Sequence, residues 1–126
     1  MKVVKIIIGR NRYGLWVKPI GLHRNRIFIE SDYGSSYSNR ILKTTLQQFY
    51  SLDQIGRGRR KTVEVPDDVF KTALELSTTV REYELSAFPK FREEFNRIEA
   101  SSAEEYLNKM KELVSRYVTI RVLRSL

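Results

Sequence analysis

The 126-residue chain contains no cysteine and a single histidine, His23. Without thiols it can form no disulfide, no thiolate zinc site and no cysteine-based catalytic centre. One imidazole also leaves few candidates for a general base or a nitrogen ligand to a metal. Any metal would have to be a hard cation held by carboxylates. We therefore expect a protein without catalytic activity, without a cofactor and without a metal.

Long apolar runs are missing as well. No apolar run is longer than the three isoleucines at residues 6–8, whereas a helix needs roughly 20 apolar residues to cross a bilayer. Residues 1–6 also lack the small-residue cleavage site of a secretory signal. We expect an intracellular protein that does not enter a membrane.

Negative charge is scarce in the first half of the chain. Residues 1–61 hold 13 Lys and Arg against 3 Asp and Glu, a net +10, whereas residues 62–126 hold 10 against 12, a net −2. Solubility alone favours some net charge, but it does not explain this asymmetry. A strongly basic half beside a nearly neutral one can attract anionic partners. The charged fraction of 30%, together with the lack of cysteine, is typical of thermophilic proteins.

The hydrophobic pattern predicts a single α+β domain over residues 1–126, with a basic β-rich half (1–61) and a helical half (62–126). Residues rich in Val and Ile predict an antiparallel meander of three strands, with polar turns at 9–12 and 23–26. The sheet is expected to have three or four strands, the fourth coming from one of two further segments. The predicted strands are 2–8, 13–20 and 27–29, joined by 61–65 or by 118–123, which also fits the end of a helix.

Helical periodicity predicts three or four helices that cover one face of the sheet. Their ranges are 39–52, 67–84, 89–99 and 102–118. Two aspartates after Pro66 favour a helix start, and Ser102 with Glu105 three residues later fits a capping box. The two glycines and four cations of residues 56–61 favour a mobile loop.

An Arg-x-Arg pair occurs three times, each time at a predicted turn or loop. The planar guanidinium presents donors that suit phosphate oxygens, so these cations are candidates for binding DNA or RNA. They are Arg10, Arg12, Arg24, Arg26, Arg57, Arg59 and Arg60, with Lys61 beside them. In a meander the first two pairs lie at opposite ends of the middle strand. They would form one cluster only in a curved sheet or in an oligomer.

Aromatic residues are interspersed with these cations, as in proteins whose aromatic rings stack on bases. They are Tyr13, Trp16, Tyr33, Tyr37 and Tyr50. The alternative is that the arginines are solvated turn residues and the rings pack in the core or on the sheet.

The run from Arg60 to Phe70, with Val63 and Val65 before Pro66 and an apolar pattern continuing through Leu76, resembles the opening of a ribbon-helix-helix DNA-binding domain. The resemblance implies a homodimer whose paired strands enter the major groove. It also implies that Val63 and Val65 face the core. Arg60, Thr62 and Glu64 would then face DNA, which adds Thr62 to the candidate residues. The predicted first helix is longer than in that family, and strand-Pro-Asp-helix is also a common structural junction.

In style the whole chain resembles small proteins encoded by viruses of hyperthermophilic archaea. Its lack of cysteine, its many Lys, Arg, Glu and Tyr residues and its short meander carry this resemblance. The resemblance implies a DNA-binding transcriptional regulator in the host cytoplasm or a component of the virion.

Two other functions are open to the sequence. Glu30 and Asp32, two positions apart at a strand end, could serve a metal-dependent nuclease, although they also suit a solvated strand end. Phe88, Phe91 and Phe95 form a helical stripe that fits either a core or a partner surface. The second option suggests a structural or assembly protein that acts through protein contacts.

Overall fold

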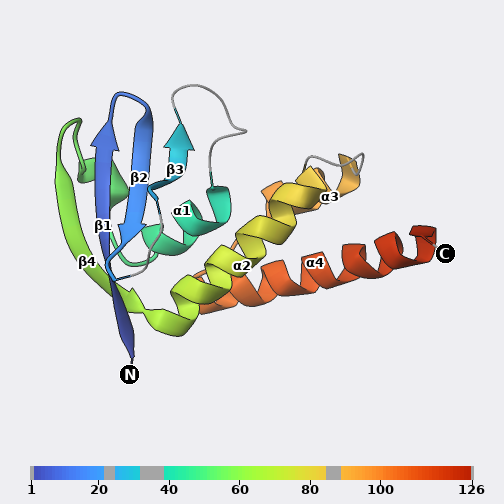
Figure 1. Cartoon of the computed structure of the whole chain (residues 1–126). Coiled ribbons are helices and arrows are strands. Elements are labelled where there is room, and N and C mark those ends of the chain that lie inside the picture. Colours follow the sequence, from blue (N-terminus) through green and yellow to red (C-terminus); the bar gives the residue numbers. More distant parts are fainter. Residues whose placement is uncertain (1, 22–24, 32–38, 85–88, 126) are drawn as a thin grey trace.

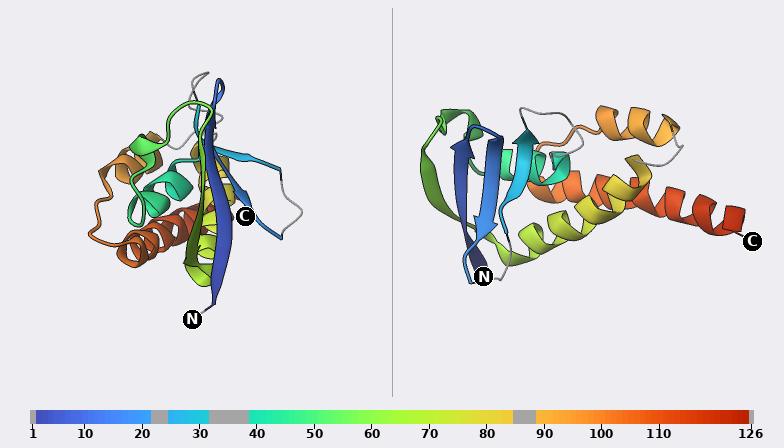
Figure 2. Two further views of the ribbon diagram at one scale, coloured as in Figure 1. Left: turned by 90° about the vertical axis from the view of Figure 1, so that its left-hand side faces the viewer. Right: turned by 45° about the horizontal axis from the view of Figure 1, so that its top comes forward.

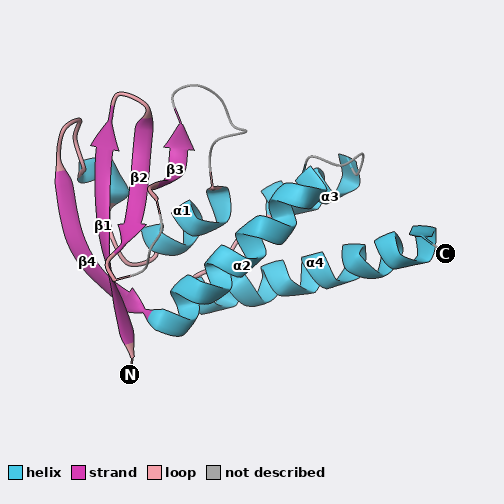
Figure 3. Ribbon diagram, viewed as in Figure 1, coloured by secondary structure: helices cyan, strands magenta, loops and turns pink. Residues whose placement is uncertain are grey.

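The computed structural model describes residues 2–21, 25–31, 39–84 and 89–125. In these residues, a four-stranded antiparallel sheet near the N-terminus is combined with four α-helices (Figure 1). Helix α1 (Arg40–Gln47) lies between the third and fourth strands in sequence, and the other helices follow the last strand (Figure 3). The predicted α+β architecture is confirmed.

The sheet has the strand order β3-β2-β1-β4. Its strands are β1 (Val3–Asn11), β2 (Gly14–Pro19), β3 (Ile27–Ser31) and β4 (Arg60–Pro66). The first three form the predicted meander. Strand β4 pairs antiparallel with β1, with Gly9 opposite Arg60 and Val3 opposite Pro66. Residues 61–65 therefore provide the fourth strand, whereas 118–123 are helical.

The turn predicted at residues 9–12 is wrong in position. Gly9 and Arg10 continue β1, and the turn lies at Arg12 and Tyr13. Gly9 is a strand residue because the Trp16 ring packs across it, and a Cβ at Gly9 would lie 2.3 Å from that ring. The glycine thus serves cross-strand packing rather than a turn.

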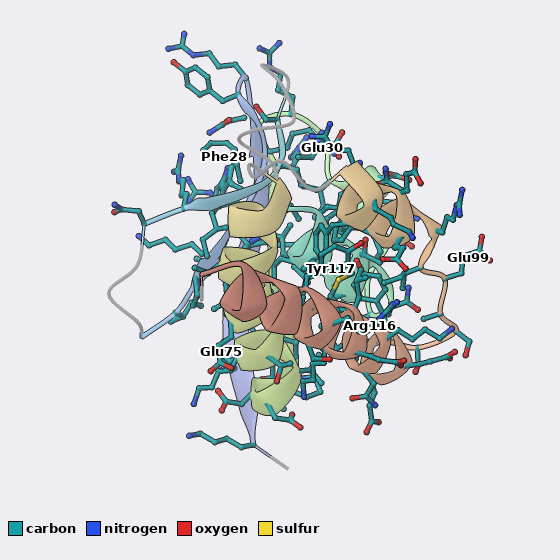
Figure 4. The ribbon with its side chains drawn as sticks, turned by 90° about the vertical axis from the view of Figure 1, so that its right-hand side faces the viewer. Phe28, Glu30, Glu75, Glu99, Arg116 and Tyr117 are labelled. Atoms are coloured by element: carbon teal, nitrogen blue, oxygen red, sulfur yellow. The ribbon has the colours of Figure 1, made fainter. Side chains whose placement is uncertain are left out.

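A β-bulge in β3 changes the side of the sheet on which its residues lie. Trp16 pairs with Phe28 and the adjacent Leu15 pairs with Glu30, so the register shifts at Ile29. Figure 4 shows Phe28 and Glu30 on opposite sides of the strand. Glu30 forms an ion pair with Lys43 of α1, with 3.2 Å between carboxylate and ammonium.

Each helix starts within one residue of its predicted start, but the last one ends at residue 125 rather than 118. The helices are α1, α2 (Asp67–Glu84), α3 (Pro89–Arg97) and α4 (Ala103–Ser125), with a short 3₁₀ helix, η2 (Leu52–Gln54), after α1. Helix α1 ends five residues before the predicted end, because the N–H groups of Phe49 and Tyr50 both donate to the Leu46 carbonyl as the chain turns away. None of the described helices combines the length and apolar character needed to cross a membrane.

Side chains cap two of these helices as their sequences suggest. The Asn39 side chain accepts a hydrogen bond from the Leu42 N–H at the start of α1. Ser102 accepts from the Glu105 N–H at the start of α4, which is one half of the predicted capping box. The other half is displaced by one residue, since Glu105 accepts from the N–H and hydroxyl of Ser101.

The hydrophobic core lies between the sheet and the helices. Viewed along the sheet, the helices α1, α3 and α4 lie on one side of it (Figure 2, left). No described helix covers the other side, which we call the open face. The core side chains come from all four strands and from each helix, for example Ile6, Ile8, Val17, Ile29, Val63, Leu46, Phe70, Phe91 and Met110.

Candidate nucleic-acid interface

Backbone hydrogen bonds bring two of the predicted arginine segments together at one end of the sheet. The Arg10 N–H donates to the Arg59 carbonyl (3.1 Å), and the Gly58 N–H donates to the Arg10 carbonyl (2.8 Å). Within the loop, the Arg59 N–H donates to the Gly56 carbonyl (3.0 Å). The Arg10 guanidinium adds a bond from Nε to the Ile55 carbonyl (2.7 Å). These bonds hold the segment in place, where the sequence favoured a mobile loop.

This arrangement creates a cluster that we call the basic end of the sheet, comprising Arg10, Arg12, Arg57, Arg59, Arg60 and Lys61. All of these side chains are exposed except that of Arg10, which is half-buried. The nearest acids in the sequence, Asp53 and Glu64, form no ion pair with it. Among the described residues, no cation of the basic end has an acidic partner.

Arg26 does not join the basic end but lies over the open face. It precedes β3, at the end of β2 far from the Arg12 turn. Its guanidinium carbon lies 4.3 Å from the centroid of the Trp16 ring, a cation–π contact. Trp16 is only 4% exposed, so this ring is covered where the sequence suggested a stacking platform for bases. Arg24 lies outside the described residues.

Strand β4 alternates as the sequence predicted. Val63 and Val65 are buried in the core, whereas Arg60, Thr62 and Glu64 are exposed on the open face. β4 is hydrogen-bonded to β1 on one edge, and it is the last strand of the sheet. Thr62 thus lies beside Arg60, next to the basic end.

Sequence reasoning missed two lysines that share the open face. Lys5 and Lys18 are exposed, and each alternates with buried neighbours along its strand. Register places Lys18 opposite Ile7, which in turn lies opposite Thr62. Along β1 and β2, apolar residues alternate with lysines, and this alternation was the signal that could have placed the two lysines on the open face.

An open cleft lies between the end of α1 and the start of β4. It measures about 400 Å³, and the residues that line it include Phe49, Tyr50, Gln54, Arg59, Arg60 and Lys61. Phe49 falls within the predicted helix 39–52 but is 41% exposed. It lies beyond the end of α1, where the helical stripe no longer continues.

Known proteins offer no guide to this arrangement. In our comparisons, no family model, curated protein or solved structure matches the chain.

Each of the two alternative sites lies only partly within the described residues. Phe91 and Phe95 are buried in the core, 0% and 4% exposed, so they do not face a partner, while Phe88 lies outside the described residues. Glu30 is paired with Lys43, and Asp32 is likewise not described. The described residues contain no cluster of three or more potential metal ligands.

The helical half, in contrast, contains three of the four ion pairs formed between described residues. Lys71 with Asp67, Lys109 with Glu105 and Arg116 with Glu94 form ion pairs of 3.0 to 3.1 Å. Arg116 and Tyr117 lie on the same stretch of α4 (Figure 4). The Tyr117 hydroxyl donates to Glu94 (2.9 Å). This hydrogen bond and the positive charge of Arg116 lower the pKa of Glu94, and burial together with the Glu94 contact raises the pKa of Tyr117.

Proposed function

We propose that the protein binds nucleic acid, without catalysing a reaction, through the basic end of its sheet and the adjoining open face. The observation that carries the proposal is that backbone hydrogen bonds bring the cations of the basic end to one end of the sheet, where none has an acidic partner among the described residues. Like charges held together repel one another. A polyanion would relieve that repulsion and release its own counterions on binding.

The chemistry of the side chains favours phosphate. Five of the six cations of the basic end are arginines, whose forked donors fit phosphate oxygens. Their backbone is held by the bonds between β1 and the loop before β4. Since only the side chains must become ordered on binding, the entropic cost of contacting phosphates is reduced. Phosphates carry no sequence information, so we expect weak sequence preference.

The test compares two variants that each remove four positive charges. One changes Arg57, Arg59, Arg60 and Lys61 to alanine. The matched control changes four exposed cations of the helical half, Lys90, Arg92, Arg97 and Lys111, none of which forms an ion pair with a described residue. Binding of labelled single- and double-stranded DNA and RNA would be followed by fluorescence anisotropy across a series of salt concentrations.

The wild type should bind less tightly as salt increases, with a linear relation between the logarithms of affinity and salt concentration. On duplex DNA the slope should become shallower by about 0.9 for each phosphate contact removed, so by about 3 to 4 in the sheet variant, and on single strands by about 0.7 for each contact, so by about 3. The control variant should keep the wild-type slope. If both variants lose affinity equally, net charge rather than a site governs binding. If the wild type binds none of the nucleic acids at low salt, the proposal is wrong.

The resemblance of residues 60–77 to a ribbon-helix-helix opening suggests a regulator that acts as a homodimer. Sedimentation equilibrium of the free protein would test the dimer directly. A monomer at concentrations where DNA binds would remove that resemblance as a basis for the mode of binding.

A further inference from the structure

The cleft between α1 and β4 combines aromatic and cationic walls. Phe49 and Tyr50 come from the connection between α1 and η2, and Gln54 comes from η2 itself. Arg59, Arg60 and Lys61 come from the start of β4 and the residue before it. A volume of about 400 Å³ falls within the range of roughly 300–1,000 Å³ common for small-ligand sites.

The two aromatic rings of the cleft are held differently. The Tyr50 hydroxyl donates to the Glu64 carbonyl (2.6 Å), and the Lys61 ammonium lies 5.7 Å from its ring centroid. Tyr50 is therefore a fixed wall. Phe49 has no ring or cation contact with another described residue, and 41% of it is exposed. An apolar ring that is open to water gains free energy when a flat apolar group covers it.

The opposite wall is positively charged, and no acid lines the cleft. A ligand that matches both walls carries a flat aromatic group and an anionic group a short distance away. Gln54 adds an amide that can both donate and accept a hydrogen bond at the edge of a base. A nucleotide has all of these features.

We infer that the cleft binds one unpaired nucleotide of a single strand, with its base on Phe49 and its phosphate against Arg59, Arg60 and Lys61. This inference rests on the proposed function and makes it more specific. Bases in a duplex are stacked on one another, so a duplex cannot place a base on Phe49 without losing that stacking. The protein should therefore favour single strands over duplexes of equal charge.

The sharpest probe changes the ligand rather than the protein. Two labelled strands of about 12 nucleotides would be compared, oligo-dT and the same sugar-phosphate chain without bases. Both carry the same phosphates, so the electrostatic part of binding is equal. Stacking of one base should make oligo-dT bind roughly 5- to 150-fold more tightly.

Protein variants then locate the base. In Phe49→Ala, the ratio of the affinity for oligo-dT to the affinity for the strand without bases should fall to near one. The affinity for the strand without bases, and the salt dependence of that affinity, should stay unchanged. Phe49→Trp keeps an aromatic plane and should retain the advantage. Val3→Ala, which trims an exposed apolar side chain at the far end of β1, should behave as the wild type.

Each other outcome overturns the inference in a recognisable way. If both strands bind equally to the wild type, the cleft takes no base, and nucleic-acid binding still stands. The cleft is likewise excluded if Phe49→Ala leaves the advantage of oligo-dT intact, because the base must then lie elsewhere. Free AMP that binds as tightly as oligo-dT would indicate a mononucleotide site. If neither strand binds at low salt, the proposed function itself fails.

Discussion

The sheet half (residues 2–66) and the helical half (residues 67–125) use their charged side chains differently. Of the twelve cations in the sheet half whose side chains are described, only Lys43 is in an ion pair; of the seven in the helical half, three are. The segments at the basic end are joined mainly by backbone hydrogen bonds. In the helical half, side chains such as Arg116 and Tyr117 connect α4 to α3 through Glu94.

Under the proposed function, this difference separates cations that form ion pairs within the fold from exposed cations that are available to a ligand. Where mainly backbone hydrogen bonds fix the geometry, the long basic side chains have no acidic partner among the described residues. Where charged side chains join helices, they are already neutralised by neighbours. The position of a cation, more than the net charge, thus indicates its role. Four predictions test this comparison.

The largest effect is expected where the backbone of the sheet half is closest packed. Gly14 has a φ of +137°, and a Cβ there would lie 2.0 Å from the Glu30 carbonyl oxygen. Gly14→Ala should destabilise the fold by about 3 kcal/mol or more, from strain and steric clash together. Gly58→Ala is the control, since its φ is +78° but nothing lies within 4 Å, so it should cost about 1–2 kcal/mol. Urea denaturation measures the free energy of unfolding of both variants. If both lose the same amount, the close contact between Gly14 and the Glu30 carbonyl does not contribute to the effect.

In the helical half, a side-chain contact should have the next largest effect. Glu94→Ala removes the partner of both Arg116 and Tyr117 and should cost about 1–2 kcal/mol. A double-mutant cycle with Tyr117→Phe isolates the hydrogen bond, with an expected coupling of about 1 kcal/mol. If the losses in unfolding free energy of the two single variants simply add in the double variant, the hydrogen bond between Glu94 and Tyr117 does not stabilise the packing of α3 on α4.

The cap of α4 should make stability depend on pH. Hydrogen bonds from the hydroxyl and N–H of Ser101 lower the pKa of Glu105 to about 2, from an ordinary value of 4.5. Because the folded-state pKa is the lower one, the cap stabilises fully above about pH 4.5, and its contribution is lost as the pH falls toward 2.

Thermal unfolding of the wild type and of Glu105→Gln between pH 2 and 5 measures this dependence. The difference in Tm between the two proteins should shrink as the pH falls. Glu104→Gln, at the adjacent exposed position in the same turn, serves as the control and should show a nearly constant difference. If the difference in Tm between the wild type and Glu105→Gln stays unchanged down to pH 2, the stabilisation by the cap does not depend on ionisation of Glu105.

The smallest effect is expected from removing the unpaired cations. The variant with alanine at Arg57, Arg59, Arg60 and Lys61 should change the free energy of unfolding by no more than about 0.5 kcal/mol. At low ionic strength the change should be toward greater stability, because repulsion between the cations is relieved. Urea denaturation at two salt concentrations measures it. A loss above about 1 kcal/mol would show that these side chains support the fold.

Much of the fold follows from local sequence patterns. Alternation around Val63 and Val65 predicted β4 and its buried side, and Pro66 with the aspartates after it predicted the start of α2. The hydrogen bond between Ser102 and Glu105 was also predictable, because a cap involves residues within one turn. The turn near Gly9 was misplaced, since the reason for that glycine is a ring that lies across it from the neighbouring strand.

The site was only partly predictable, because it depends on distant pairing. The Arg-x-Arg pairs were visible, but the contact between Arg10 and Arg59 requires β4 to pair with β1, about 50 positions away. The position of Arg26 over Trp16 depends on the path of the chain before β3. Phe49 was included in the predicted helix 39–52 because helical periodicity does not show where α1 ends.

The pairing of β1 with β4 has a consequence for the energetics of the whole chain. The arginines of the first turn and those of the loop before β4 become neighbours only when the long intervening segment closes. The unfolded chain therefore carries the same charges without the cluster. A polyanion that binds the cluster binds the native state preferentially, and mass action then raises the apparent stability by RT ln(1 + [L]/Kd). Occupied by its ligand at 100 times Kd, the protein would resist unfolding by about 2.7 kcal/mol more than when free.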